Sequence, residues 1–310
     1  MKKLRFVVSL TNKENDYQLE QAAMADEASH RFGVDLEILY ADNDAITQSQ
    51  QLLKIIQGPP VGRPDGILFE PAGGTALPQV GRAAAAAGIA WVVMNREGDY
   101  IADLRRSFRV PVFSVTSNHE EIGRIQGRQL AALLPKGGSV LHIEGPAENY
   151  AAKGRTVGMS ETKPPQIQAK AIRGQWTDVS AQKAIASWMR LSTSRQSHMD
   201  VVSAQNDAMA VGARKAFQEL PDAGMRERWL SLPYIGVDGV PKTGLAWVKS
   251  GLLTATVIVP AMAGQAIEML VRAIQNGLTP PEKTLTVPLS FPSLDELARS
   301  HAEKSRIMSV

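Results

Sequence analysis

Segments typical of strands and of helices alternate along nearly the whole chain, and this alternation constrains the fold more than any other feature. Residues 4–10 form an apolar run typical of a strand. Residues 17–32 carry apolar side chains at helical spacing, and Gly33 ends that run. Similar pairs recur as far as an extended stretch at 284–290. Repeated strand–helix units predict parallel sheets that are covered by helices and joined by right-handed crossovers.

The number of strands points to two lobes. About ten predicted strands are more than one sheet comfortably carries, so we expect an α/β fold of two doubly wound parallel-sheet lobes. No low-complexity linker separates them, which favours several short crossings, near Ser117, Val259 and Pro288. Three crossings make a hinge, and a cleft between lobes is a preferred ligand site. The expected lobes are residues 1–116 with 260–287, and residues 117–259 with 288–310.

Charge and composition exclude several classes of protein. The net charge is only +3 and the basic residues are scattered, so we expect no nucleic-acid partner. The chain has no cysteine, which excludes disulfides, thiol nucleophiles and cysteine-bound metals. The first apolar run is short and Arg5 interrupts it, so we expect a first strand here and not a signal peptide. We therefore expect either a cytoplasmic protein or one whose leader has been removed.

The motifs of common enzymes are missing. No glycine-rich dinucleotide or phosphate loop follows the first strand, and no Gly-x-Ser-x-Gly elbow occurs. His119 and Glu120 open like a zinc-protease helix, but Gly123 stands where the second ligand would be. The turn Gly73-Gly74-Thr75 could bind an anion, but the sequence favours a tight strand-to-helix turn there. His142 lies on an apolar strand and is predicted to be a core histidine. We expect no catalysis, no cofactor and no metal.

Polar side chains recur where the apolar strands end, and ligands bind at that edge of an open α/β sheet. In the segment around Asn206, we expect Asp207 to cap the following helix and Asn206 to face a ligand. Arginine donates, carboxylates accept and amides do both, while aromatic rings suit the C–H faces of a sugar. This mixture favours a ligand with several hydroxyls. The candidate residues are Tyr17, Gln18, Glu70, Asn95, Arg96, Arg155, Trp176, Asn206 and Asp238.

Several motifs together carry a family resemblance. They are Val92-Val93-Met94-Asn95-Arg96, Ser117-Asn118 with Gly123 and Gly127, Arg155-x-x-Gly158, Trp176-x-Asp178, Ala204–Ala213 and Ile235–Gly239. With them the chain resembles the periplasmic sugar-binding proteins of the ribose-binding type, which are related to the effector cores of Lac-repressor-like regulators. The resemblance implies a monomeric periplasmic receptor that closes on a sugar and delivers it to the membrane subunits of an ABC importer. It also adds Asn15 to the residues that face the ligand.

The chain departs from the family pattern at the strand ends. Asn95 stands where the family has aspartate, and Glu70 stands where asparagine or aspartate is common. The stretch before Pro260 lacks an expected glutamine. These changes leave a pentose, a hexose, a polyol or an amino sugar open, and Glu70 favours a ligand with an extra donor.

Two other functions stay open at this point. One is a cytoplasmic or stand-alone sugar sensor, with a sensor kinase or another protein as its partner. A DNA-binding regulator would need a helix-turn-helix module ahead of the first strand, where this chain has residues 1–3. The other is an enzyme acting on a sugar, for which no motif is present.

Overall fold

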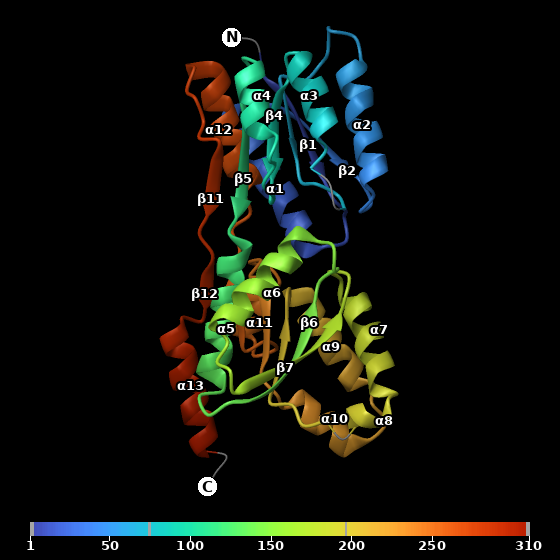
Figure 1. Cartoon of the computed structure of the whole chain (residues 1–310), viewed down its shortest axis with the longest axis vertical. Coiled ribbons are helices and arrows are strands. Elements are labelled where there is room, and N and C mark those ends of the chain that lie inside the picture. Colours follow the sequence, from blue (N-terminus) through green and yellow to red (C-terminus); the bar gives the residue numbers. More distant parts are fainter. Residues whose placement is uncertain (1–2, 74–75, 196, 308–310) are drawn as a thin grey trace. The chain divides into compact units, whose positions relative to one another are not determined.

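The computed structural model describes residues 3–73, 76–195 and 197–307, and the chain forms two compact units (Figure 1). Unit 1 comprises Met1–Ser117 and Pro260–Thr286, and unit 2 comprises Asn118–Val259 and Val287–Val310. Each unit holds a sheet dominated by parallel strands with helices between them, which confirms the predicted fold class. Within the described ranges, none of the helices is both long enough and apolar enough to span a membrane.

The sheet of unit 1 has the strand order β11-β5-β4-β3-β1-β2, and all its pairings are parallel. In register, Val8 pairs with Ile38 on one side and with Leu68 on the other. The strands are β1 (Arg5–Leu10), β2 (Asp35–Tyr40), β3 (Gly66–Phe69), β4 (Ala90–Met94), β5 (Val112–Ser117) and β11 (Lys283–Thr286). The helices are α1 (Asp16–Phe32), α2 (Ala45–Gln57), α3 (Pro78–Ala86), α4 (Ile101–Ser107) and α12 (Ala263–Asn276).

The sequence of unit 1 explains these elements locally. Strands β3, β4 and β5 are buried along their whole length, as expected for parallel strands covered by helices on both faces. Helix α1 begins after Asn15, whose side chain accepts bonds from two backbone amides of the first turn. It ends at Gly33, which adopts a left-handed conformation that glycine takes without steric cost.

The sheet of unit 2 has the order β12-β10-β9-β8-β6-β7 and is parallel except for β12, which runs antiparallel to β10. The strands are β6 (Gly138–Glu144), β7 (Ile167–Arg173), β8 (Val201–Ala204), β9 (Tyr234–Asp238), β10 (Ala255–Ile258) and β12 (Leu289–Phe291). The helices are α5 (His119–Leu133), α6 (Tyr150–Thr162), α7 (Asp178–Met189), α8 (Ser192–Arg195), α9 (Asp207–Gln218), α10 (Ala223–Leu230), α11 (Gly244–Lys249) and α13 (Leu294–Ile307). Helix α13 lies beside α5 (Figure 1).

The structure corrects the sequence-based reading of the chain in two places. The extended stretch expected at 284–290 is two strands, β11 and β12, which belong to the sheets of different units. Helices α4, α8, α10 and α13 were not expected from the pattern. In α10 the helix is short and mostly half-buried or exposed, with Trp229 as its one fully buried residue, so it shows little apolar periodicity.

Helices α5 and α6 touch along their backbones, and this contact positions the arginine discussed below. A Cβ atom on Gly123 would lie 2.1 Å from the carbonyl oxygen of Arg155. A Cβ atom on Gly158 would lie 1.8 Å from the carbonyl oxygen of Glu120. Only glycine leaves room for this approach, so the two glycines fix the depth at which α6 lies against α5.

Candidate ligand-binding site

At the carboxyl edge of the unit 1 sheet, the structure brings Glu70 and Asn95 together. They follow the paired strands β3 and β4, and the Asn95 amide nitrogen donates to a Glu70 carboxylate oxygen at 2.8 Å. Glu70 is buried and Asn95 is half-buried. Asn95 has a φ of 57°, a left-handed conformation that asparagine tolerates better than most residues. Arg96 comes next and is also half-buried.

The three candidates of the first loop hold that loop together. Asn15 accepts from the backbone amides of Tyr17 and Gln18 at 2.9 and 3.3 Å. The Gln18 side-chain oxygen accepts from the Thr11 amide at 3.0 Å, and the Tyr17 hydroxyl donates to the Pro260 carbonyl at 3.1 Å. Tyr17 and Gln18 are buried. These bonds give the three side chains a structural role, and their contact with a ligand stays a prediction.

In unit 2, the structure gathers Arg155, Trp176 and Asp238. Arg155 projects from α6 and is 5% exposed, and one guanidinium nitrogen donates to the Gln205 carbonyl. A second guanidinium nitrogen lies 3.5 Å from an Asp238 carboxylate oxygen. The guanidinium carbon also lies 5.4 Å from the centre of the Trp176 ring, within the range of a cation–π contact. These contacts form a compact group of one cation, one anion and one aromatic ring.

The prediction that Asp207 caps α9 was wrong. Asn206 is the residue that caps α9, because its side-chain oxygen accepts from the Met209 amide at 2.9 Å. Its amide nitrogen donates to the Trp176 carbonyl at 2.9 Å, and the side chain is buried. Asp207 turns inward instead of capping. Both residues are good caps by type, so the local sequence could not separate them.

Asp207 and Gln205 have structural roles that the sequence did not predict. Burial raises the pKa of Asp207 well above its usual value, and the negative charge of Asp238 raises it further, against hydrogen bonds from Thr256 and Gly239 that lower it. The Gln205 side-chain oxygen accepts from the Gly145 amide, and its nitrogen donates to the Ala152 carbonyl and the Thr156 hydroxyl. Gln205 thus ties the end of β6 to α6.

The remaining motif predictions can be placed as well. His142 is buried in β6, as predicted, with a ring nitrogen 3.1 Å from the Ser203 hydroxyl, and burial lowers its pKa to about 4. His119 begins α5 and is buried. Among the described residues, no group of three or more His, Cys, Asp or Glu side chains could hold a metal ion. Gly74 and Thr75 of the candidate anion turn lie outside the described residues.

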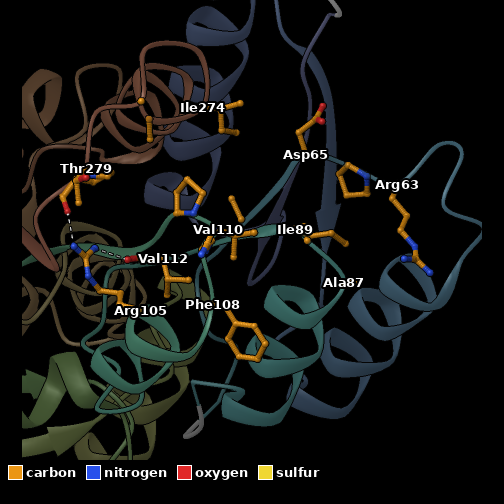
Figure 2. A pocket seen from close by; sticks show the side chains of 18 of the residues that line it. Arg63, Asp65, Ala87, Ile89, Arg105, Phe108, Val110, Val112, Ile274 and Thr279 are labelled. Carbon is orange, nitrogen blue, oxygen red and sulfur yellow. Dashed lines mark hydrogen bonds between the residues drawn. The ribbon is translucent and has the colours of Figure 1, made fainter.

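Unit 1 also contains a cavity of about 860 Å³ at the opposite ends of β3, β4 and β5 (Figure 2). In its wall, Arg105 donates to the Val112 carbonyl at 2.7 Å and to the Pro280 carbonyl at 3.0 Å. Its guanidinium therefore joins β5 to the segment before β11. Ligands of open α/β sheets bind at the carboxyl ends of the strands. The candidate site is therefore the end that carries Glu70 and Asn95, and this cavity is not part of it.

Comparison with known proteins assigns the family. The family described as "Periplasmic binding protein domain" matches residues 6–278. A Rhizobium meliloti protein named for rhizopine binding is 30% identical over 77% of this chain and 73% of its own length. The D-allose-binding periplasmic protein of Escherichia coli is 25% identical over 89% and 86%. The Caulobacter myo-inositol binding protein, solved with myo-inositol, matches with a TM-score of 0.75 at 20% identity, over 99% of this chain and 97% of its own. The chain belongs to the periplasmic binding protein family.

Proposed function

We propose that the chain binds a monosaccharide or a related polyhydroxylated small molecule and delivers it to an ABC importer. The observation that carries this proposal is the set of polar residues that follows the carboxyl ends of neighbouring parallel strands in each unit. Glu70 and Asn95 form such a pair in unit 1, and in unit 2 Asp238, at the end of β9, lies 3.5 Å from Arg155, which projects from α6. The names of the related proteins support the same ligand class, because they refer to rhizopine, allose and myo-inositol.

Each side chain has a chemical role in this proposal. Arg96 and Arg155 donate hydrogen bonds to ligand hydroxyls, and Glu70 and Asp238 accept them. Asn15, Gln18, Asn95 and Asn206 offer amide groups that can do either, and the rings of Tyr17 and Trp176 cover apolar C–H faces. A hydrogen bond to a charged group contributes about 1.5–3 kcal/mol. A few such bonds are sufficient for micromolar affinity, about −8 kcal/mol.

Titration calorimetry with pentoses, hexoses, polyols and amino sugars tests the proposal. We expect one of these classes to bind saturably at micromolar concentration. Arg96→Ala should abolish binding at that concentration, because a buried ligand hydroxyl loses its charged donor. Arg82→Ala is the matched control, since Arg82 is exposed on α3 of the same unit. Failure of every sugar at millimolar concentration contradicts the function, and unchanged affinity of Arg96→Ala removes that residue from the site.

We further propose that the protein acts in the periplasm as a monomer, that it is not an enzyme, and that it has no nucleic-acid partner. The family description supports the compartment, and the scattered basic residues support the last point. Incubating the bound sugar with the protein should leave its mass unchanged in mass spectrometry. Light scattering should give one chain of about 33.5 kDa, with and without the sugar.

A further inference from the structure

Asp207 is held where the neighbouring strands β8, β9 and β10 of unit 2 come together. It is 3% exposed and begins α9, directly after the segment that follows β8. One carboxylate oxygen accepts from the backbone amide of Gly239, at the end of β9, at 2.8 Å. The other oxygen accepts from the Thr256 hydroxyl, in β10, at 2.7 Å. Both oxygens are therefore used to tie neighbouring strands together.

The bond to Gly239 fixes a backbone conformation that is rarely adopted. Asp238 has a φ of 106° and Gly239 a φ of 58°, so two successive residues lie in the left-handed region. Such a conformation persists at a non-glycine residue only when its surroundings hold it. Here the Asp238 carbonyl accepts from the Val259 amide at 3.0 Å. The Gly239 amide, in the same peptide group, donates to Asp207. Both polar atoms of this peptide are thus fixed.

Two glycines make room for the Asp207 carboxylate. A Cβ atom on Gly236 would lie 2.1 Å from one carboxylate oxygen, and a Cβ atom on Gly244 would lie 2.0 Å from the other. Gly236 lies within β9, where glycine contributes neither side-chain packing nor strand propensity. The close approach of Asp207 is a physical reason for glycine at this position.

We infer that Asp207 is a positioning residue, which fixes the Asp238-Gly239 turn and so places the Asp238 carboxylate for the ligand. The inference rests on the proposed function, in which Asp238 accepts a bond from a sugar hydroxyl. The fixed peptide sets the direction in which the Asp238 side chain leaves the backbone. Arg155, 3.5 Å away, then meets that carboxylate from α6. Asp207 is buried, and it affects ligand affinity through the position that it gives to the Asp238 carboxylate.

The test is a double-mutant cycle on the affinity for whichever sugar of the panel binds the wild-type protein. Asp207→Ala should weaken binding about 10- to 100-fold, because the turn loses its anchor. Asp207→Asn should stay within about threefold of wild type, because its oxygen can face the Gly239 amide while its nitrogen donates to Thr256. In an Asp238→Ala background, Asp207→Ala should have almost no further effect, since its action passes through Asp238.

Two further measurements separate positioning from general stability. Ile185→Val, a core variant in α7, lowers stability without touching the turn and should leave affinity unchanged. Should Asp207→Ala fail to fold, Thr256→Val removes the partner of the other oxygen and should weaken binding several-fold. Full additivity in the cycle, wild-type affinity of Asp207→Ala, or equal losses in Asp207→Ala and Asp207→Asn would each overturn the inference.

Hydrogen exchange of the Gly239 amide, followed by NMR, tests the anchor without any sugar. The amide should be protected in wild type and in Asp207→Asn, and should exchange much faster in Asp207→Ala. An unprotected Gly239 amide in the wild-type protein overturns the positioning role. If no sugar binds but the amide behaves as expected, the proposed function fails and the anchoring of the turn stands.

Discussion

The two units differ in the number of titratable side chains that they bury. Among the described residues, unit 1 buries one Asp, Glu, His, Lys or Arg side chain, Glu70, whereas unit 2 buries four: His119, His142, Arg155 and Asp207. Both units also bury neutral amides, such as Gln205 in unit 2 and Gln48 in unit 1. Gln48 bonds to the Ser9 hydroxyl, the Glu70 carbonyl and the Ala72 amide.

This difference has consequences for stability. A neutral amide among neutral partners does not titrate, so its contribution is the same at every pH between 4 and 8. A buried charge is expensive to leave without its partner, and a buried histidine resists protonation. Unit 2 should therefore be the unit that is sensitive to charge-changing substitutions and to acid, and unit 1 should respond mainly to the loss of amide hydrogen bonds.

The largest effect is expected for Arg155→Ala. This change removes a buried guanidinium that lies 3.5 Å from the Asp238 carboxylate and donates to the Gln205 carbonyl. Breaking a buried pair in this way costs about 3–5 kcal/mol. We expect that loss in the free energy of unfolding from urea titration.

Arg173→Ala is the matched control for Arg155→Ala. Arg173 lies on β7 of the same unit, with its side chain 57% exposed and 3.5 Å from Glu144. An exposed pair contributes about 0–1 kcal/mol, so this variant should unfold nearly like wild type. If both variants lost the same free energy of unfolding, the buried Arg155 would contribute no more to stability than an exposed arginine.

The next largest effect on stability is expected from His142, which should make unit 2 sensitive to acid. Its pKa falls from 6.5 to about 4 because burial disfavours the imidazolium. Between these values the unfolded chain binds the proton and the folded chain does not, so stability is present above pH 6.5 and is lost as the pH falls towards 4. The loss over that interval is roughly 3 kcal/mol.

The measurement compares wild type with His142→Asn in urea titrations at several pH values. Asparagine does not titrate and can keep a bond to Ser203. The difference in free energy of unfolding between the two proteins therefore reports the titration of His142. Asp207 acts in the opposite sense, because its raised pKa makes its contribution fall as the pH rises, but it is present in both proteins. A gap that is the same at pH 7 and pH 4 would contradict the prediction.

The sequence was sufficient for the parts of the fold that depend on local pattern. The apolar runs of β3 and β4 and the helix stop at Gly33 lie within a few residues of what they determine. The inward position of Asp207 could not be predicted, because it depends on partners such as Gly239 and Thr256 that are distant in the chain. These partners meet Asp207 only when β8, β9 and β10 are assembled.

A partial signal for the inward position of Asp207 was present. Gly236 lies inside an otherwise apolar strand, and glycine at such a place indicates that another group approaches closely. The sequence does not show which group approaches. The left-handed backbone at Asn95, Trp176 and Asp238 was equally hidden, because none of the three is glycine. The candidate residues were thus found by their position after strands, whereas their geometry required the structure.

The smallest effect is expected in unit 1, for Gln48→Ala. This change leaves the buried Ala72 amide and Glu70 carbonyl without their partner, at a cost of about 2 kcal/mol. Because these partners are neutral, the gap to wild type in urea titrations should be equal at pH 7 and pH 5. Gln50→Ala, on the exposed face of the same helix α2, is the control and should stay within about 0.5 kcal/mol of wild type. A gap that changes with pH would show that Gln48 acts on the charge of Glu70, and the two units would then share the chemistry that now separates them.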